Sequence, residues 1–329
     1  MHNRQNALNI WLKTLFAETP FKVAPLAGDA SFRCYYRIFH GDNTYVVMDA
    51  PPDKEMTTPF ITIAQALANC GIHTPHIHAV DQTNGFVLLE DLGDLLLLGA
   101  LNAATADKFY QAAMTTLLEI QQCPLAIELP VFGKSHMLQE LALFRDWFLD
   151  QYLAITLNEA AQQCLQDTFN WLADKISLQP QVFIHRDYHS RNLIIVDQSM
   201  PPSLGVIDFQ DAMRGPFAYD LVSLLKDCYI QWPREQIVTW LTYFHSQLDT
   251  NYSLADFTHA FDLCGLQRHL KVLGIFCRLH LRDKKPAYLR DLPLTFNYMM
   301  ACLEGYEELQ PFYDLMQRNV VRPFMEKTK

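Results

Sequence analysis

The stretch from Phe183 to Asp208 constrains this chain more than any other part of its sequence. It carries an acid at Asp187, an amide five positions later at Asn192, and a second acid at Asp208. Short apolar runs flank these polar residues, which predicts buried strands joined by polar loops. Because strands fix the position of the loops that they flank, oxygen-bearing side chains on those loops are able to converge on one ligand.

The residue types in this stretch fit phosphoryl transfer. That reaction needs an aspartate that orients the attacking hydroxyl and accepts its proton, and oxygen ligands that hold Mg²⁺ against the nucleotide phosphates. Asp187 suits the first role, and Asn192 and Asp208 suit the second. The alternative is that these side chains only cap turns, as an isolated loop aspartate commonly does. The combined spacing, order and flanking pattern favour the catalytic interpretation.

Several motifs carry a resemblance to known enzymes. HRDYHSRN and VIDF resemble the catalytic and metal-binding loops of protein kinases, with Tyr188 where those carry Leu and Gln210 where they carry the Gly of D-F-G. The stretch GPFAYDL, residues 215–221, is more similar to the aminoglycoside phosphotransferase and choline kinase group. Within that group, GDASFR, VVMDAPP and LKVLGIFCRLHLRD resemble the bacterial anomeric kinases that phosphorylate N-acetylmuramate and N-acetylglucosamine at C1 in cell-wall recycling. The resemblance runs from about Leu26 to Leu294.

The resemblance implies a protein-kinase-like α/β (α+β) fold with two lobes. A small lobe, residues 1–92, would hold an antiparallel sheet and a helix that cover the nucleotide. A larger, mainly helical lobe, residues 93–329, would hold the catalytic and metal loops and the acceptor site, and the reaction would occur in the cleft between the lobes. The sequence patterns agree. They predict strands at 21–26, 32–39, 44–48, 76–80, 86–89, 182–184, 193–196 and 204–207, and helices at 6–17, 59–69, 103–122, 134–153, 158–176, 217–228, 234–248, 254–280 and 293–303.

The resemblance places ATP on the small lobe. The turn at residues 27–33 would cover the phosphates, since small residues let backbone N–H groups approach them closely, although a plain hairpin turn has the same composition. The segment after the fifth strand would be the hinge that binds adenine through main-chain atoms. The predicted cofactor-binding residues are Gly28, Ser31, Phe32, Arg33, Glu90 and Leu92.

The third strand, YVVMD at residues 45–49, lacks the Lys that most kinases pair with the phosphates and with a helix Glu. The following helix offers Gln65 and no Glu. Either the chain is a non-catalytic nucleotide-binding regulator, or another cation meets the phosphate charge. Arg33 and Arg37 are the candidates, because a guanidinium is able to hold two phosphate oxygens. The intact acids and amide of the first stretch favour an active enzyme.

An acceptor site is predicted in the larger lobe. Lys271, Arg278 and Arg282 step by seven and by four positions, which places them along one side of a helix. The guanidinium of an arginine suits the lactyl carboxylate of N-acetylmuramate, and a solvated basic face is the alternative. The predicted substrate residues are His189, Arg191, Asp211, Arg278 and Arg282, and the predicted structural supports are His185 and Asp220.

Composition narrows the partners. The formal net charge is −10 and no long run of Lys or Arg is present, which argues against a nucleic-acid partner and favours a small molecule. Besides an amino sugar, a small alcohol such as choline, an amino acid or an aminoglycoside is an alternative acceptor. ATP and Mg²⁺ are the expected cofactors.

The sequence also predicts where the protein resides. Lys13 interrupts the first apolar helix, so we expect no signal peptide, and no apolar run is long enough to span a bilayer. The eight cysteines are scattered without a C-x-x-C arrangement. They are expected to be reduced core residues of a cytoplasmic protein rather than a disulfide or zinc framework.

Overall fold

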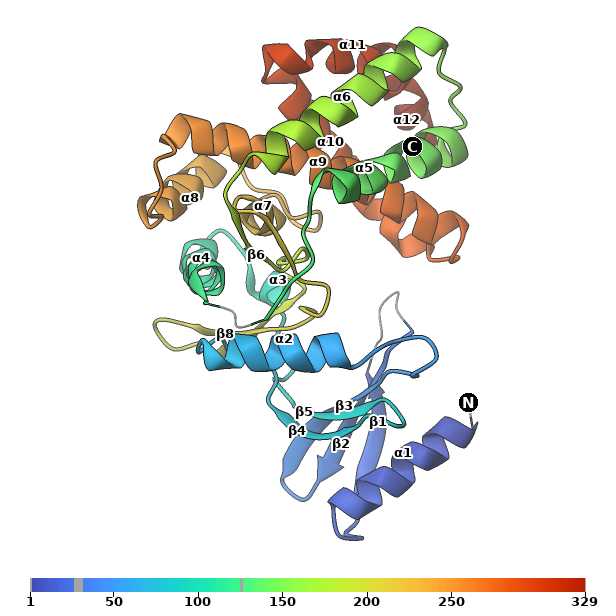
Figure 1. The fold of residues 1–329 in the computed structure, drawn as a ribbon, viewed down its shortest axis with the longest axis vertical. Coiled ribbons are helices and arrows are strands. Elements are labelled where there is room, and N and C mark those ends of the chain that lie inside the picture. The colour runs from blue at the N-terminus through green and yellow to red at the C-terminus, as the bar shows by residue number, and fades with distance from the viewer. Residues whose placement is uncertain (1, 27–31, 125–126, 329) are drawn as a thin grey trace. The chain divides into compact units, whose positions relative to one another are not determined.

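The protein is described by a computed structural model that covers residues 2–26, 32–124 and 127–328 (Figure 1). The chain divides into two compact units. Unit 1 comprises Met1–Ala100, Cys123–Glu128 and Asn192–Asp211, and unit 2 comprises Leu101–Gln122, Leu129–Arg191 and Ala212–Lys329. Sequence analysis predicted a single boundary after residue 92, so it placed Cys123–Glu128 and Asn192–Asp211 in the second lobe rather than in the first unit.

Unit 1 is built on a five-stranded antiparallel sheet of order β1-β2-β3-β5-β4. The five strands and the two longer helices predicted for this region are therefore confirmed, with ends shifted by a few residues. A second antiparallel pair, β7 with β8, belongs to the same unit. The elements of unit 1 are α1 (His2–Leu15), β1 (Lys22–Leu26), β2 (Cys34–His40), β3 (Asn43–Asp49), α2 (Thr58–Asn69), β4 (Ile77–Asp81), β5 (Phe86–Glu90), α3 (Leu97–Ala100), β7 (Leu193–Asp197) and β8 (Ser203–Val206).

Helix α1 lies alongside this sheet (Figure 1). Its apolar face buries Leu8 and Leu12 in one cluster with Ile38 of β2, Val47 of β3 and Phe86 of β5. These residues recur at helical spacing in α1 and on one face of the strands, so the apolar pattern of the sequence sets the contact. The helix predicted at the start of the chain is confirmed as a core element.

The β7–β8 hairpin is joined to the segment that follows β5. The N–H of Ile195 donates to the carbonyl of Leu95 over 2.8 Å. A Cβ at Gly205 would lie 2.6 Å from Cδ1 of Leu92, so any larger residue there would require the Leu92 side chain to move. The predicted hinge residue Leu92 therefore packs directly on the hairpin that precedes Asp208.

A disulfide links Cys70, at the end of α2, to Cys123, with their Cα atoms 5.8 Å apart. The prediction that all eight cysteines are reduced is wrong for this pair. Sequence spacing could not reveal the link, because 53 positions separate the two residues and only the fold brings them together. The other six cysteines are free thiols.

Unit 2 is mainly helical and is organised around α9, which packs against α5, α6, α7 and α10. Every residue of α9 from Ala260 to Gly274 is buried, so this helix forms the centre of the unit rather than one of its faces. The elements of unit 2 are α4 (Ala106–Gln122), α5 (Lys134–Leu143), the π-helix η1 (Phe144–Tyr152), α6 (Glu159–Ser177), β6 (Gln181–Ile184), β9 (Met213–Pro216), α7 (Tyr219–Leu225), α8 (Arg234–Ser246), α9 (Leu254–Leu281), η2 (Pro286–Asp291), α10 (Leu292–Glu304), η3 (Glu307–Leu309), α11 (Gln310–Asn319) and α12 (Val321–Lys327).

Two features of unit 2 differ from the sequence prediction. The helix predicted at 134–153 changes from α5 to π-helical geometry at Phe144. Near this junction a Cβ at Gly274 would lie 2.3 Å from the carbonyl carbon of Leu143, so glycine lets α9 pack against the α5 backbone. Sequence patterns did not predict strand β9, because it contains Gly and Pro and is defined by its pairing with β6. They also did not predict helices α11 and α12. None of the described helices has the length and apolar character needed to cross a bilayer.

Candidate active site

The loop that follows β6 carries Asp187 on a backbone that other elements hold. Arg186 adopts a φ of +73°, in the left-handed region that costs a non-glycine residue about 1–3 kcal/mol. The fully buried Asp220 of α7 accepts hydrogen bonds from the N–H groups of His185, at 2.6 Å, and Arg186, at 3.0 Å. Two backbone donors to one carboxylate therefore define the path of the chain just before Asp187.

Two further side chains of the loop hold its geometry. Nδ1 of His185 accepts the N–H of Asp187 over 3.3 Å, and the imidazole contacts the Tyr188 ring edge-on. Tyr188 is fully buried, and its hydroxyl donates to the carbonyl of Ala113 on α4 over 2.9 Å. A Leu at this position, as in protein kinases, would lack that hydrogen bond.

The Asp187 side chain keeps 44% of its surface exposed while cations surround it. Nη1 of Arg268, on α9, lies 3.3 Å from Oδ1 of Asp187 and donates to the carbonyl of Arg186 over 2.7 Å. Partial burial opposes ionisation of Asp187, but Lys271, Arg268, His189 and Arg186 together hold its pKa well below the ordinary value. Asp187 is therefore a carboxylate at any pH at which the protein functions.

A buried carboxylate on α5 binds two of these cations. Glu140 accepts from Arg186 at 2.7 Å and from Gln267 at 3.0 Å, and it forms an ion pair with Lys271 at 3.3 Å. Burial opposes ionisation of Glu140, yet Lys271 and Arg186 lower its pKa below the ordinary value. Sequence analysis missed Glu140, although an acid inside the apolar helical stretch HMLQELALF was a signal that it could have used. It also misplaced Lys271, which lies in this cluster rather than on a basic face.

The predicted substrate residues His189 and Arg191 both lie against Tyr229. The Arg191 guanidinium is 4.7 Å from the centre of the Tyr229 ring, and the His189 ring contacts the same ring edge-on at 5.5 Å. Burial lowers the pKa of His189, although Asp227 and Asp187 act in the opposite sense, so the imidazole is neutral near pH 7. The aromatic group continues through Phe276 to Tyr288.

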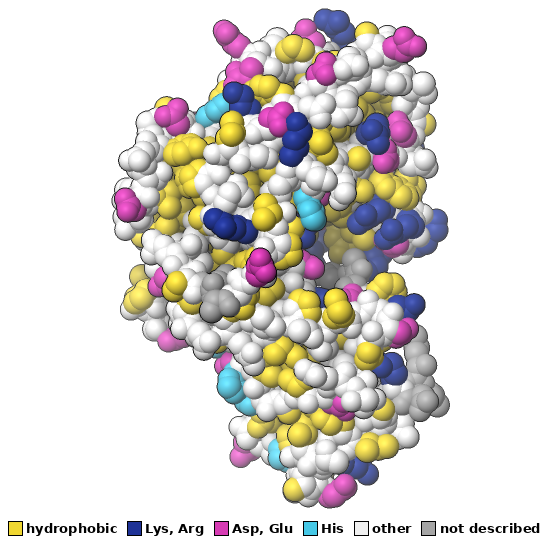
Figure 2. All heavy atoms as spheres, in the orientation of Figure 1, with side chains coloured by type: hydrophobic (Ala, Val, Ile, Leu, Met, Phe, Trp, Pro, Cys, Tyr) yellow, Lys and Arg dark blue, Asp and Glu magenta, His cyan; other side chains and the backbone are white. Residues whose placement is uncertain are grey.

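The other two predicted substrate arginines differ in their surroundings. Arg278 is half-buried, and its Nε has no hydrogen-bond partner among the described residues. Arg282 is exposed and forms two hydrogen bonds with the adjacent Asp283, at 2.7 and 2.9 Å. Arg282 is thus already paired with a carboxylate. On the face shown in Figure 2, Lys and Arg side chains lie at several separate places, with one group at the right-hand edge.

The predicted metal residues meet in unit 1. Nδ2 of Asn192 donates to Oδ2 of Asp208 over 3.3 Å, and Nε2 of Gln210 donates to Oδ1 of the same carboxylate over 2.8 Å. Asp208 has a φ of +65°, and Phe209 beside it is fully buried and stacks on Phe60 of α2. Gln210, the departure from D-F-G, therefore orients the acid. Asp211 is exposed and accepts a longer contact from Gln210, at 3.4 Å.

Asn192 and Asp208 supply only part of the ligand set that a Mg²⁺ ion needs. Among the residues that the structure describes, no three His, Cys, Asp or Glu side chains group together as metal ligands. Asn192 and Asp208 supply hard oxygen atoms from two side chains that touch. Mg²⁺ in kinase sites is commonly bound by one or two such side chains together with phosphate and water oxygens, so the pair fits that ion and no all-protein metal cage.

On the phosphate side, Gly28 and Ser31 lie outside the described residues. Phe32 is exposed, and Arg33 forms an ion pair with Glu55 at 3.0 Å in the segment between β3 and α2. Burial, helped by Asp208 and opposed by Arg33, raises the pKa of Tyr35 to about 12. The charges of both Arg33 and Asp208 therefore act on the Tyr35 hydroxyl.

The structure distinguishes the two cations proposed to replace the missing Lys. Arg37 is held by Asp91, at 2.7 Å, and by Asp94, at 2.8 Å, in the hinge segment. Arg33 instead lies near Tyr35. Glu55, which sequence analysis did not consider because it precedes the helix, gives Arg33 the acidic partner that the missing Lys has in other kinases.

The predicted hinge residue Glu90 lies at the end of β5. The N–H of Glu90 donates to the carbonyl of His76 over 2.8 Å, so that group belongs to the sheet. The Glu90 carboxylate accepts the N–H of His76 over 3.1 Å.

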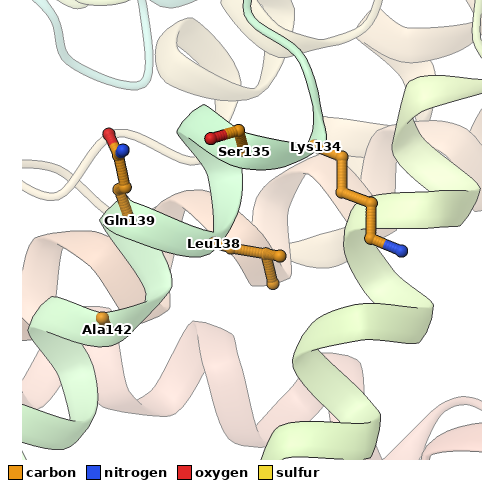
Figure 3. A pocket seen from close by; sticks show the side chains of 5 residues that line it. All are labelled: Lys134, Ser135, Leu138, Gln139 and Ala142. Carbon is orange, nitrogen blue, oxygen red and sulfur yellow. The ribbon is translucent and has the colours of Figure 1, made fainter.

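Two surface cavities of unit 2 contain none of these residues. Figure 3 shows one of about 640 Å³, lined by five residues of α5 alone: Lys134, Ser135, Leu138, Gln139 and Ala142. Lys134 pairs with Asp174 of α6 at 2.6 Å. A cavity lined by one helix cannot enclose a ligand. The other, of about 950 Å³, lies at the start of α6.

Sequence comparison relates the chain to known enzymes. The sequence profile of the phosphotransferase enzyme family matches residues 22–256, more than half of the chain. The chain belongs to the phosphotransferase enzyme family. This phosphotransferase is 38% identical to the N-acetylmuramate/N-acetylglucosamine kinase of Pseudomonas aeruginosa over 328 residues, which covers 95% of this chain and 96% of that protein. It is 36% identical to the Neisseria meningitidis enzyme of the same name, with 95% of each chain covered.

Solved structures share the fold of this phosphotransferase. The choline kinase LicA of Streptococcus pneumoniae superposes with a TM-score of 0.66 at 14% identity, covering 91% of this chain and 99% of that one. The ADP-bound aminoglycoside phosphotransferase APH(2'')-Ib gives a TM-score of 0.60 at 15% identity, covering 90% and 97%. At these identities the likeness concerns the fold, and it confirms the predicted kinase-like α+β class.

Proposed function

We propose that this phosphotransferase transfers the γ-phosphate of ATP, with Mg²⁺, to the anomeric hydroxyl of N-acetylmuramate and N-acetylglucosamine. The observation that carries the acceptor is the identity of 36–38% over 95% of the chain to enzymes named for these two sugars. The chemistry is supported separately by the ionised Asp187 of unit 2 and the Asn192–Asp208 pair of unit 1.

In the proposed reaction the C1 oxygen of the sugar attacks the γ-phosphorus. A new O–P bond forms, the bond between the γ-phosphorus and the β–γ bridging oxygen breaks, and ADP leaves. The Asp187 carboxylate accepts a hydrogen bond from the C1 hydroxyl, orients it, and receives its proton as the new bond forms. Mg²⁺, when bound through Asn192 and Asp208, would supply positive charge against the phosphates.

Because its pKa is low, Asp187 is a weak base. Its main contribution is therefore to position the hydroxyl, which suits a reaction whose catalysis depends chiefly on alignment and charge. Arg33 would contribute charge on the phosphate side, and the hinge around Glu90 and Leu92 would contact adenine.

On the acceptor side, His189, Arg191 and Tyr229 form a group beside Asp187 that combines an aromatic face with a cation. We propose that Arg278 binds the lactyl carboxylate. Burial and the neighbouring Arg282 lower the pKa of Arg278, so both disfavour its charged form. An anionic ligand would offset that cost.

Enzyme assay tests this proposal. ADP release from ATP and Mg²⁺ would be measured against N-acetylmuramate, N-acetylglucosamine, choline, homoserine and kanamycin, with the Asp187→Asn variant as the control for contaminating activity. The methyl glycosides of both sugars lack a free C1 hydroxyl and serve as matched acceptor controls. We expect turnover with the two free sugars only. Turnover with a methyl glycoside would overturn the anomeric position, and turnover with choline or kanamycin alone would overturn the acceptor class.

A further inference from the structure

We infer that Arg268 is a positioning residue for the reaction, which fixes the Asp187 carboxylate relative to the backbone from which it extends. The inference rests on the proposed function, since it assigns Arg268 a role through Asp187. Arg268 lies on α9, 81 positions from Asp187 in the sequence. No part of the catalytic motif predicts it.

The geometry of one nitrogen supports this role. Nη1 of Arg268 lies 2.7 Å from the carbonyl oxygen of Arg186 and 3.3 Å from Oδ1 of Asp187. A guanidinium nitrogen of this type carries two hydrogens, so it is able to donate one to each acceptor. The two acceptors belong to consecutive residues, and holding both restricts the rotation of the Asp187 side chain.

Arg268 itself has little freedom. The residue is 3% exposed, and its guanidinium lies 5.9 Å from the centre of the Tyr219 ring. Helix α9 is buried over the whole length around it. An arginine packed in this way loses no further side-chain entropy when the acceptor binds, unlike one that is mobile in solvent.

The distribution of charge singles out Arg268 among the cations near Asp187. Glu140 forms ion pairs with Arg186 and Lys271. Among the described residues, the ion pair of Arg268 is with Asp187. Burying a cation costs several kcal/mol of desolvation free energy unless the cation is paired. The Asp187 carboxylate is the partner that offsets this cost for Arg268.

Variants separate positioning from simple structural support. Arg268→Met removes both hydrogen bonds and keeps an extended side chain. Arg268→Lys keeps the charge on a shorter side chain without the guanidinium fork. Arg234→Met is the matched control, because Arg234 pairs with the buried Asp262 at 3.0 Å in the same unit and has no part in the proposed site. Steady-state kinetics would use the acceptor on which the wild type turns over, with thermal unfolding as the measure of folding.

We expect Arg268→Met to lower kcat about a hundredfold, the lower range of a general-base contribution, with the KM for ATP changed by less than about threefold. Arg268→Lys should show an intermediate kcat, and Arg234→Met should unfold at a lower temperature with unchanged kcat. Combined with Asp187→Asn, Arg268→Met should have almost no further effect on the residual rate, since residues that act together are not additive.

Other outcomes would overturn the inference. One is a kcat of Arg268→Lys equal to that of the wild type. Another is an effect of Arg268→Met on the acceptor KM alone. The third is a loss of kcat on adding Arg268→Met that is equally large in the wild-type and the Asp187→Asn backgrounds. If Arg268→Met does not fold, Arg268→Lys alone decides, through its kcat. A wild type inactive on every acceptor contradicts the proposed function, whereas an active wild type with unaffected Arg268 variants contradicts only this inference.

Discussion

The side-chain amide of Asn192 donates a hydrogen bond to the carboxylate of Asp208, with 3.3 Å between Nδ2 and Oδ2. Gln210 holds the other oxygen of the same carboxylate. The two proposed metal ligands and the residue that orients one of them therefore form one unit of structure at the end of the β7–β8 hairpin.

Replacing Asp208 should weaken Mg²⁺ binding. We expect Gln210→Ala, which removes only the orienting hydrogen bond, to raise the Mg²⁺ concentration for half-maximal rate by about ten- to a hundredfold, and Asp208→Ala to raise it at least as much. Initial rates over a Mg²⁺ series at saturating ATP would measure this. Asp197→Ala is the control, because Asp197 is an exposed acid of the same hairpin. An unchanged Mg²⁺ dependence in Asp208→Ala would remove Asp208 from the metal site.

Asp187→Asn should lower kcat strongly, because the amide keeps the shape of the side chain but lacks the negative charge that orients the hydroxyl and receives its proton. The expected loss of kcat is about 10²–10⁴-fold, with nucleotide affinity nearly unchanged. In the wild type, the low pKa of Asp187 means that its ionisation gives no acidic limb in kcat between pH 5 and 8. Retention of more than about a tenth of the wild-type kcat in Asp187→Asn would exclude this role.

Arg33→Ala should affect ATP and spare the acceptor. Loss of a hydrogen bond to a charged group is worth about 1.5–3 kcal/mol, so the KM for ATP should rise, or kcat fall, by about ten- to a hundredfold. Glu55→Gln should show a smaller change in the same direction, since it removes the ion-pair partner. Arg37→Ala is the control, because Asp91 and Asp94 already hold that residue. Equal kinetics for Arg33→Ala and wild type would exclude Arg33 as the phosphate cation.

Arg278→Ala should discriminate between the two sugars. If Arg278 binds the lactyl carboxylate, its loss should cost N-acetylmuramate about 2–4 kcal/mol in kcat/KM and leave the uncharged N-acetylglucosamine nearly unaffected. Arg282→Ala should change neither strongly, since Arg282 is paired with Asp283. Equal losses with both sugars would make Arg278 structural, and Arg191 and Arg214 would then be tested for the carboxylate.

Asp220 should make the folded state less stable as pH rises. Burial raises its pKa from 3.8 to about 6, against the opposing effects of His185 and the two backbone donors. A carboxyl with the higher pKa in the folded state binds protons more tightly there, so stability is lost between about pH 4 and pH 6. Two pKa units correspond to about 3 kcal/mol.

Urea unfolding of wild type and Asp220→Asn over a pH series would measure this effect. The other titrating groups are common to both proteins, so the difference between their free energies of unfolding isolates Asp220. We expect the wild type to lose about 3 kcal/mol relative to the variant as pH rises through that interval. Parallel curves would show that the pKa of Asp220 is not raised.

The sequence by itself determined the chemistry and the class of fold. The roles predicted for Asp187, Asn192 and Asp208 depend on residue type and on short spacing within one stretch, and such spacing is preserved in any fold that keeps the loops. The spacing of apolar residues likewise predicted the five strands of unit 1 and the long helices, because side-chain burial follows the period of the element.

Tertiary structure alone decided which residues surround these groups. Arg268 and Glu140 come from helices far from Asp187 in the sequence, and their contacts arise only when α5 and α9 pack together. Glu55 becomes the partner of Arg33 through the path of a connecting segment, which no periodicity reports. Cys70 and Cys123 are joined for the same reason. The sequence sets local geometry and chemical type, whereas contacts between distant segments depend on packing of the whole unit. Packing also places the cations that lower the pKa of Asp187 against the opposing effect of burial.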